Sequence, residues 1–198
     1  MKKPNAFDET KASGEWTPIE LGGHHLVIKK VEETTSSSGK SMIVVYFDFA
    51  KNDKQPDFMA NEFRNDIRAD KKWPRSGTAY ILVEGDDGNC TRNFKTFISS
   101  FEHSNNCEAN WGDKFTAQFK DKRIGAVFGE VENEYNGKVT MRHELRWFCG
   151  DDKVDTAQIP APKYLNGNSP AAKPASKPTT DDNGFISVPE GAENDLPF

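Results

Sequence analysis

A tryptophan between cations is the feature of this sequence that points most directly to chemistry. Lys71, Lys72, Trp73 and Arg75 occupy one short stretch that also contains Pro74. Binding of single-stranded nucleic acid without sequence preference combines cations, which contact phosphates, with exposed rings on which bases stack. The stretch therefore predicts part of a single-stranded DNA site. The alternative is that Trp73 fills the end of a barrel and stacks on no base.

Three further pairs of basic residues are candidates for phosphate contacts. They are Arg64 and Arg68, Lys122 and Arg123, and Arg142 and Arg146. The alternative for the two arginine pairs is a solvated strand face, because acidic residues are interleaved among them. If any of these cations binds phosphate, affinity should fall steeply as the salt concentration rises.

The last four residues form a candidate site of a different kind. Asp195, Leu196, Pro197 and Phe198 follow a stretch rich in proline and acidic residues. An apolar ring beside carboxylates suits a partner pocket that has a hydrophobic floor and a basic rim. We therefore expect this tip to bind a partner protein. The alternative is a frayed terminus without a role.

Soft metal ligands are present, but their spacing argues against a metal site. Cys90, His103, Cys107 and Cys149 are the residues that would ligate zinc, and His103 and Cys107 stand at i and i+4. Cys90 and His103 are separated by the whole length of an expected helix, and no CxxC knuckle occurs. The sequence therefore predicts no metal and no other cofactor.

Catalytic motifs are also missing. A nuclease needs clustered carboxylates to hold Mg²⁺, and Asp66, Asp70, Asp86 and Asp87 are candidates only because they are acidic. The sequence contains no phosphate-binding glycine loop, nucleophile elbow or zinc-protease motif. We therefore expect a protein that is not an enzyme, with a metal-dependent nuclease as the least favoured alternative.

Composition divides the chain into a body and a tail. We expect a flexible N-terminus over residues 1–14, one folded domain over 15–160 and a disordered acidic tail over 161–198, where prolines replace bulky apolar residues. The net charge of −5 is not the strongly basic balance that would by itself indicate nucleic-acid binding.

The chain also lacks signals for a membrane or for secretion. No apolar run is long enough to cross a membrane, and the first residues lack the apolar core of a secretion signal. Three cysteines without a CxxC pair fit a reducing compartment. We expect a cytoplasmic protein with no membrane partner. The oligomeric state stays open, a homo-oligomer included.

Alternation of apolar and polar residues predicts a mainly β domain. Strands are expected over residues 25–33, 40–50, 58–68, 78–84, 123–134 and 138–149, of which 58–68 has the weaker pattern. Asn136 and Gly137 between the last two strands are a strong hairpin signal. On the last strand we expect one face to carry Val139, Met141, Leu145 and Trp147 and the other to carry Lys138, Thr140, Arg142, Glu144 and Arg146.

One segment has the period of a helix instead. Phe94, Phe97, Ile98 and Phe101 recur at i, i+3, i+4 and i+7, which predicts an amphipathic helix over about residues 91–103 with its aromatic face in the core. Strands, one helix and a closing hairpin is the order of an OB-fold. We therefore expect a five-stranded OB-fold-like barrel with one amphipathic helix between strands three and four.

The sequence also resembles a known family. The residues that carry the resemblance are Phe94, Lys95, Phe97, Ile98, Glu102, Ser104, Asn105, Lys122, Arg123, Ile124, Gly125, Val127, Phe128, Gly129, Glu130, Asn136, Gly137 and Lys138. Over about residues 15–165 the chain looks like phage proteins of Gram-positive hosts that are described as single-stranded DNA-binding or recombination-associated. The last residues are similar to the acidic tip of bacterial and phage single-stranded DNA-binding proteins, with Leu196 in place of an isoleucine.

The resemblance implies a function in phage replication or recombination. The protein would coat and protect single-stranded DNA in the host cytoplasm, and its tip would recruit replication or recombination proteins. The alternative is an interaction module that uses the same barrel to bind a host or phage protein.

Overall fold

The computed structural model describes residues 2–4, 7 and 17–165, and its residues up to Lys163 belong to one compact unit. The expected flexible N-terminus falls outside the described residues apart from 2–4 and 7. The expected acidic tail falls outside them apart from 161–165, and so does the tip Asp195–Phe198.

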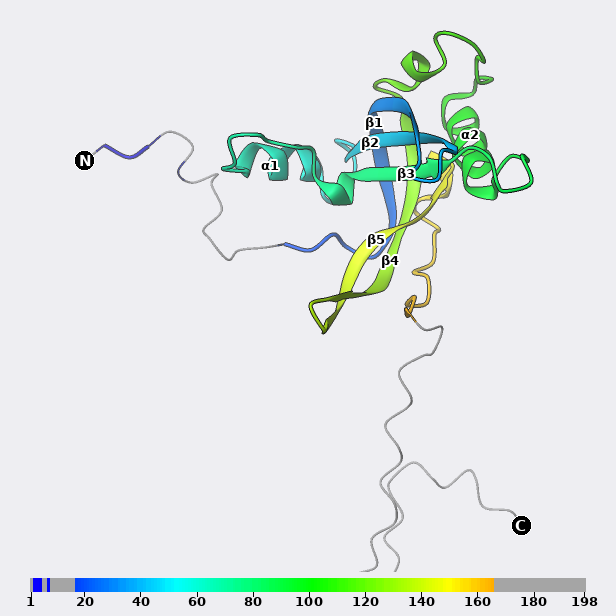
Figure 1. Cartoon of the computed structure of the whole chain (residues 1–198). Coiled ribbons are helices and arrows are strands. Elements are labelled where there is room, and N and C mark those ends of the chain that lie inside the picture. The colour runs from blue at the N-terminus through cyan, green and yellow to red at the C-terminus, as the bar shows by residue number, and fades with distance from the viewer. Residues whose placement is uncertain (1, 5–6, 8–16, 166–198) are drawn as a thin grey trace, which may run out of the picture. The chain divides into compact units, whose positions relative to one another are not determined.

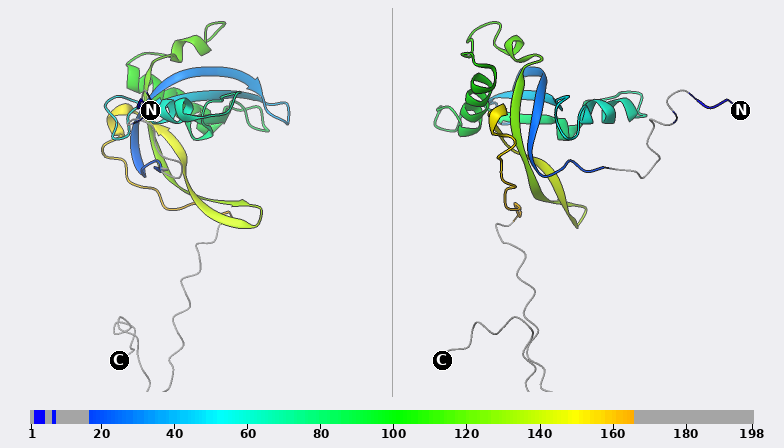
Figure 2. Two further views of the ribbon diagram at one scale, coloured as in Figure 1. Left: turned by 90° about the vertical axis from the view of Figure 1, so that its left-hand side faces the viewer. Right: turned by 180° about the vertical axis from the view of Figure 1, so that it is seen from behind.

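The domain is built on one five-stranded antiparallel sheet in the order β3-β2-β1-β4-β5 (Figure 1). The strands are β1 (Gly22–Thr35), β2 (Ser41–Phe49), β3 (Thr78–Leu82), β4 (Arg123–Tyr135) and β5 (Lys138–Cys149), and the helices are α1 (Phe58–Asn65) and α2 (Arg92–Asn105). The expectation of a mainly β protein is confirmed in these terms. Figures 1 and 2 show α1 and α2 on opposite sides of the β1–β3 strands.

Two hairpins supply most of the sheet, and the strands of both were predicted. Asn136 and Gly137 connect β4 to β5 with φ angles of 51° and 73°, the left-handed pair that a two-residue hairpin turn requires. The β1–β2 hairpin is closed by a hydrogen bond of 2.8 Å from the Ser36 amide to the Lys40 carbonyl. Local turn chemistry therefore sets both registers.

The sheet remains open between its two outer strands. β3 is hydrogen-bonded to β2, and β5 is hydrogen-bonded to β4; within the described part of the chain no ladder joins β3 to β5. Both outer strands thus keep one edge without a strand partner. The position of the unpaired edges determines where the domain has a groove.

The β4–β5 hairpin extends beyond the rest of the sheet. β1 pairs with β4 only between Arg123 and Phe128, so that the remainder of β4 pairs with β5 as a two-stranded arm (Figures 1 and 2). Lys163 lies along the other edge of this arm, where its amide donates to the Glu130 carbonyl at 2.9 Å and its carbonyl accepts from the Glu132 amide at 2.8 Å. The arm is therefore held by the chain that follows β5.

Aromatic rings fill the core on the α2 side. The predicted helix is confirmed, and the Thr91 hydroxyl caps it by accepting a hydrogen bond of 3.2 Å from the Phe94 amide. The Phe97 ring centroid lies 5.3 Å from that of Phe119 and 5.2 Å from that of Phe148. Edge-on and tilted ring contacts of this kind stabilise the core beyond the contribution of the buried area alone.

The prediction of a strand over residues 58–68 is wrong, because this segment forms α1. Met59 is fully buried and Phe63, four residues on, packs its ring 5.8 Å from that of Trp73. Residues four apart share one face of a helix. In a segment this short and polar, that period is hard to recognise from the sequence. The described residues therefore contain two α-helices, one more than expected.

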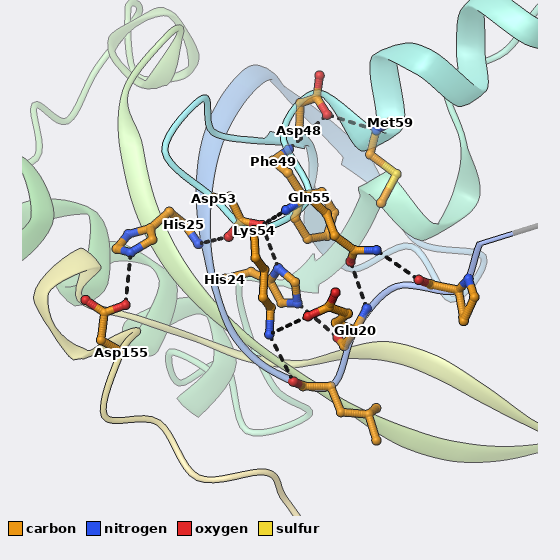
Figure 3. A network of polar contacts seen from close by, with 12 residues as sticks. Glu20, His24, His25, Asp48, Phe49, Asp53, Lys54, Gln55, Met59 and Asp155 are labelled. Carbon is orange, nitrogen blue, oxygen red and sulfur yellow. Dashed lines mark hydrogen bonds and ion pairs between the residues drawn. The ribbon is translucent and has the colours of Figure 1, made fainter. Parts of the chain in front are cut away.

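A distant carboxylate caps this helix. The Asp48 carboxylate on β2 accepts hydrogen bonds of 2.9 Å at Oδ1 from the amides of Phe49 and Met59 (Figure 3). The side chain of Asp57, the residue before α1, makes no capping bond. Burial raises the pKa of Asp48, although the two amides oppose the shift. A capping group supplied by another element leaves no local helix signal in the sequence.

Candidate nucleic-acid interface

A groove lies along the open seam of the sheet. Side chains of β3 and β5 line it together with α1 and the short 3-10 helix Arg75–Gly77, and it has a volume of about 620 Å³. This is within the range of small-molecule and cofactor sites, roughly 300–1,000 Å³. The groove is therefore large enough to hold a ligand.

Three of the predicted cations meet in this groove. Arg75, Arg142 and Arg146 line it from the 3-10 helix and from β5. The Arg146 guanidinium is held in place, since its Nη1 donates to the carbonyls of Glu130 at 3.3 Å and Ala161 at 2.9 Å. Arg75 and Arg142 are exposed and form no side-chain hydrogen bond or ion pair with any described residue. Their guanidinium groups are available to a ligand.

Two carboxylates share the groove with these cations. Glu62 of α1 and Glu144 of β5 also line it. Three guanidinium groups against two carboxylates leave a modest excess of positive charge. The groove favours an anion but does not have the strongly positive field of a purely electrostatic binder.

The exposed rings in the groove are Tyr80 on β3 and Trp147 on β5. Tyr80 is 62% exposed and Trp147 is 43% exposed, and both line the groove. Neither was singled out from the sequence as a stacking residue. Exposed rings next to cations are what single-stranded nucleic acid requires.

A β-bulge explains why Trp147 was missed. β5 pairs Trp147 with Val127 but Leu145 with Phe128, so that Arg146 is an extra residue in the ladder. The expectation that Leu145 and Trp147 share a face is wrong, since Leu145 packs on the core while Trp147 is exposed. The signal in the sequence is the adjacent Trp147 and Phe148, which breaks strict alternation.

Trp73 lies against the core. Its indole Nε1 donates to the carbonyls of Phe47 at 3.2 Å and Gly77 at 3.1 Å, and the ring packs on the core cluster. Any side chain at Gly77 would collide with this indole, because a Cβ atom there would be 2.7 Å from Nε1. Trp73 thus packs in the interior, as in the alternative to base stacking, but the described sheet is open and shows no closed barrel end for it to fill.

The other cations near α1 are exposed but do not enter the groove. Lys71 donates from Nζ to the Arg64 carbonyl at 3.0 Å, and the Lys72 ammonium is 4.0 Å from the Asp70 carboxylate. Arg64 is in the last turn of α1 and Arg68 lies beyond the helix, so the two do not share a strand face.

Lys122 and Arg123 lie at the start of β4, and neither lines the groove. Arg123 is exposed, and one of its guanidinium nitrogens is 3.9 Å from an Asp151 carboxylate oxygen. The structure thus divides the predicted cations into groove residues and residues elsewhere on the surface.

The acidic candidates for a nuclease site each contact a different partner. Arg68 holds the Asp66 carboxylate through Nε and Nη2, at 2.7 to 3.0 Å, and lowers the pKa of Asp66 to about 2. Asp86 pairs with Lys40, and Asp87 accepts from the amide of Asn89 at 3.0 Å.

The candidate zinc ligands do not form a cluster. Cys90, His103 and Cys149 border one hollow beside α2, and Cys107 is exposed. In the described ranges no group of three or more histidine, cysteine, aspartate or glutamate side chains is arranged to hold a metal ion. Burial raises the pKa of the Cys149 thiol to about 11.

A polar network joins β1 to the loop before α1 (Figure 3). His24 is fully buried, and its two ring nitrogens face the Asp53 carboxylate at 3.0 Å and the Glu20 carbonyl at 2.9 Å. Gln55 donates to the Pro18 carbonyl at 3.0 Å and accepts from the Glu20 amide at 2.8 Å. The network fixes the segment around Ile19, which lines the groove.

Asp53 is the centre of this network. Its carboxylate accepts from the backbone amides of His25 at 2.8 Å and Gln55 at 2.9 Å as well as contacting His24. Burial opposes ionisation, but the hydrogen bonds from His24 and the amides outweigh it and lower the pKa of Asp53. Asp53 therefore stabilises the fold as an anion.

No protein-family model and no curated protein matches the chain. The resemblance to phage single-stranded DNA-binding proteins therefore stays a hypothesis. Among the helices of the described residues, none combines the length and the apolar character needed to cross a membrane.

Replacement of Asp53 by asparagine should destabilise the protein at neutral pH by about 2 kcal/mol, because hydrogen bonds to a charged group are lost. A lowered native pKa means that the stabilisation is complete above the usual aspartate value of 3.8 and is lost as pH falls through the native pKa. Urea unfolding at pH 7 and at about pH 3 measures both effects, and the difference between wild type and Asp53→Asn should shrink at acid pH. Asp70→Asn, at an exposed position, is the control and should change stability by less than about 0.5 kcal/mol. Equal stability of Asp53→Asn and wild type at pH 7 would contradict the analysis.

Proposed function

We propose that the groove between β3 and β5 binds single-stranded DNA without sequence preference. The observation that carries the proposal is that Tyr80 and Trp147, both exposed, line the same groove as the available guanidinium groups of Arg75 and Arg142. Bases stack on the two rings, and the arginines contact the phosphates. Stacking and charge are both sequence-tolerant, since every base has a ring face and every nucleotide a phosphate.

The topology supports the same proposal. The order β3-β2-β1-β4-β5, with α2 between β3 and β4, fits an OB-like barrel that is open at the β3–β5 seam. Together with the resemblance to phage proteins, this leads us to propose a cytoplasmic protein that protects single-stranded DNA during phage replication or recombination. Its role is binding and not catalysis.

Removal of a stacking ring should weaken DNA binding markedly. Trp147→Ala and Tyr80→Ala should each reduce affinity for oligo(dT) by about 1 to 3 kcal/mol, or about five- to 150-fold, because each ring is the platform for one base. Fluorescence anisotropy with labelled oligo(dT) measures the change.

The matched control is Trp111→Ala. Trp111 is also exposed, but it stacks on Phe115 at 5.1 Å and does not line the groove. This variant should bind DNA as the wild type does, after a thermal melt has shown that it is folded. A loss of affinity in Trp111→Ala with none in Trp147→Ala would place the DNA on another face.

The phosphate contact of Arg142 should appear in the salt dependence. Each phosphate contact on a single strand contributes about 0.7 to the slope of log affinity against log salt concentration. Arg142→Ala should therefore lower the slope by about 0.7, whereas Arg123→Ala, outside the groove, should leave it unchanged. Titrations at several salt concentrations measure the slopes. The opposite ranking of the two variants would move the site to the start of β4.

A second candidate function is the binding of an extended peptide. The observation that favours it is that β3 and β5 each keep an edge without a strand partner in the described structure, and such edges accept an added strand. Tryptophan fluorescence titrated with poly(dT) at low and high salt separates the two candidates. Only the DNA site predicts quenching that salt abolishes.

Recruitment of other proteins would depend on the segment that ends in Asp195, Leu196, Pro197 and Phe198, outside the described residues. We propose that this acidic and apolar segment binds replication or recombination proteins. Deletion of Asp195–Phe198 should leave the affinity for DNA unchanged or raise it, because negative charge is removed from the protein. Binding of candidate replication and recombination proteins should be lost in a pull-down. Collapse of DNA binding on removal would contradict this separation of roles.

A further inference from the structure

A second hollow adjoins the groove and has a different chemistry. It lies beside α2 and the 3-10 helix Asp151–Lys153 and has a volume of about 780 Å³. The groove and this hollow share Thr96 and Phe148 as lining residues, so that they meet at the face of α2 that looks toward β5.

The hollow is lined by cations and hydroxyl groups, with no carboxylate among its lining residues. Arg92 and Lys95 come from α2 and Lys153 from the 3-10 helix, and all three are exposed. None of these three forms an ion pair with a described residue. Thr96 and Ser99 add hydroxyl groups of the kind that bind phosphate oxygens.

The carboxylates that flank Lys153 are already paired. Asp152 lies 2.9 Å from Nε2 of His103, and Asp151 lies 2.7 Å from Nδ1 of His25. Both carboxylates therefore have a contact other than Lys153, while the charge of Asp152 still acts on Lys153. The hollow therefore attracts anions more strongly than the groove does, because Glu62 and Glu144 line the groove and no carboxylate lines the hollow.

We propose that the second hollow, lined by Arg92, Lys95 and Lys153, holds the phosphates of the same DNA strand after it leaves the groove. The inference rests on the proposed function of the groove. The hollow has no exposed phenylalanine, tyrosine or tryptophan: Phe148 is buried in the core, and the exposed ring at the hollow is the imidazole of His103, which lies 2.9 Å from Asp152. Nucleotides there are held by charge and are not stacked.

This division of roles predicts a dependence on the length of the DNA. An oligonucleotide that fills only the groove contacts Tyr80, Trp147 and the groove arginines, whereas a longer one also reaches the hollow. Site sizes of OB-type binders span about 4 to 16 nucleotides. Oligo(dT) of about 5 and about 16 nucleotides therefore provides the short and the long probe.

The test is the triple variant Arg92→Ala, Lys95→Ala and Lys153→Ala in the full chain. It should lose about tenfold or more in affinity for the long oligo(dT) at about 0.1 M salt, and its salt slope should fall by about 2, as expected for three phosphate contacts. Affinity for the short oligo(dT) should change less than twofold. Anisotropy titrations of both probes measure these values.

The matched control replaces Lys120, Lys122 and Arg123 by alanine, which removes the same three charges from an exposed region outside both hollows. An equal loss of long-probe affinity in this control would attribute the effect to net charge and overturn the inference. So would a triple variant that binds both probes as the wild type does, or one that loses both equally.

Failure of the underlying function gives a different result. If wild type binds neither probe, the proposed function fails and this inference fails with it. If wild type binds both probes and the triple variant binds them with the same affinity, this inference fails but the proposed function of the groove stands. Thermal stabilisation by inorganic phosphate that the triple variant loses, with unchanged binding of the long probe, would assign the hollow to a free anion and overturn the inference.

Discussion

The absence of a β3–β5 ladder from the described sheet is the constraint on which the rest of the site depends. Had these edges paired, backbone hydrogen bonds would occupy the seam, and Tyr80 and Trp147 would lie over a closed wall. Instead, α2 and the 3-10 helix Arg75–Gly77 border the seam, and side chains face the space between the strands. Because the seam is open, the space between the two strand edges is a groove lined by side chains.

Hydrogen bonds of polar groups inside the domain hold the walls of this groove in place. The Asp53 carboxylate links β1 to the loop before α1, and Asp48 caps α1 from β2. The indole of Trp73, bonded to the carbonyls of Phe47 and Gly77, fixes the 3-10 helix that carries Arg75. Buried hydrogen bonds to charged or aromatic groups are costly to leave unmade, so they hold the groove walls in one arrangement.

Local signals in the sequence were sufficient wherever the structure itself is local. The Asn136–Gly137 turn predicted the β4–β5 hairpin, and the spacing of the α2 aromatics predicted the main helix. The same approach failed at α1, where eight residues are too few for the period to stand out. The capping group of α1 comes from Asp48, and no window of adjacent residues contains that information.

The sequence by itself determined the five strands of the sheet and the main helix, but it mistook α1 for a sixth strand. It also supplied the residue types, cations and rings, that the proposed site needs. Only the tertiary structure decided which of them lie together: Arg75 and Arg142 line one groove because β3 and β5 are the two ends of the sheet order, while Lys122 and Arg123 lie elsewhere. It also exchanged the two tryptophans, exposing Trp147 and placing Trp73 against the core. The physical reason is that strand order, a bulge in the β5 ladder and hydrogen bonds from a ring to a distant backbone are non-local interactions, which residue types and short-range spacing do not specify.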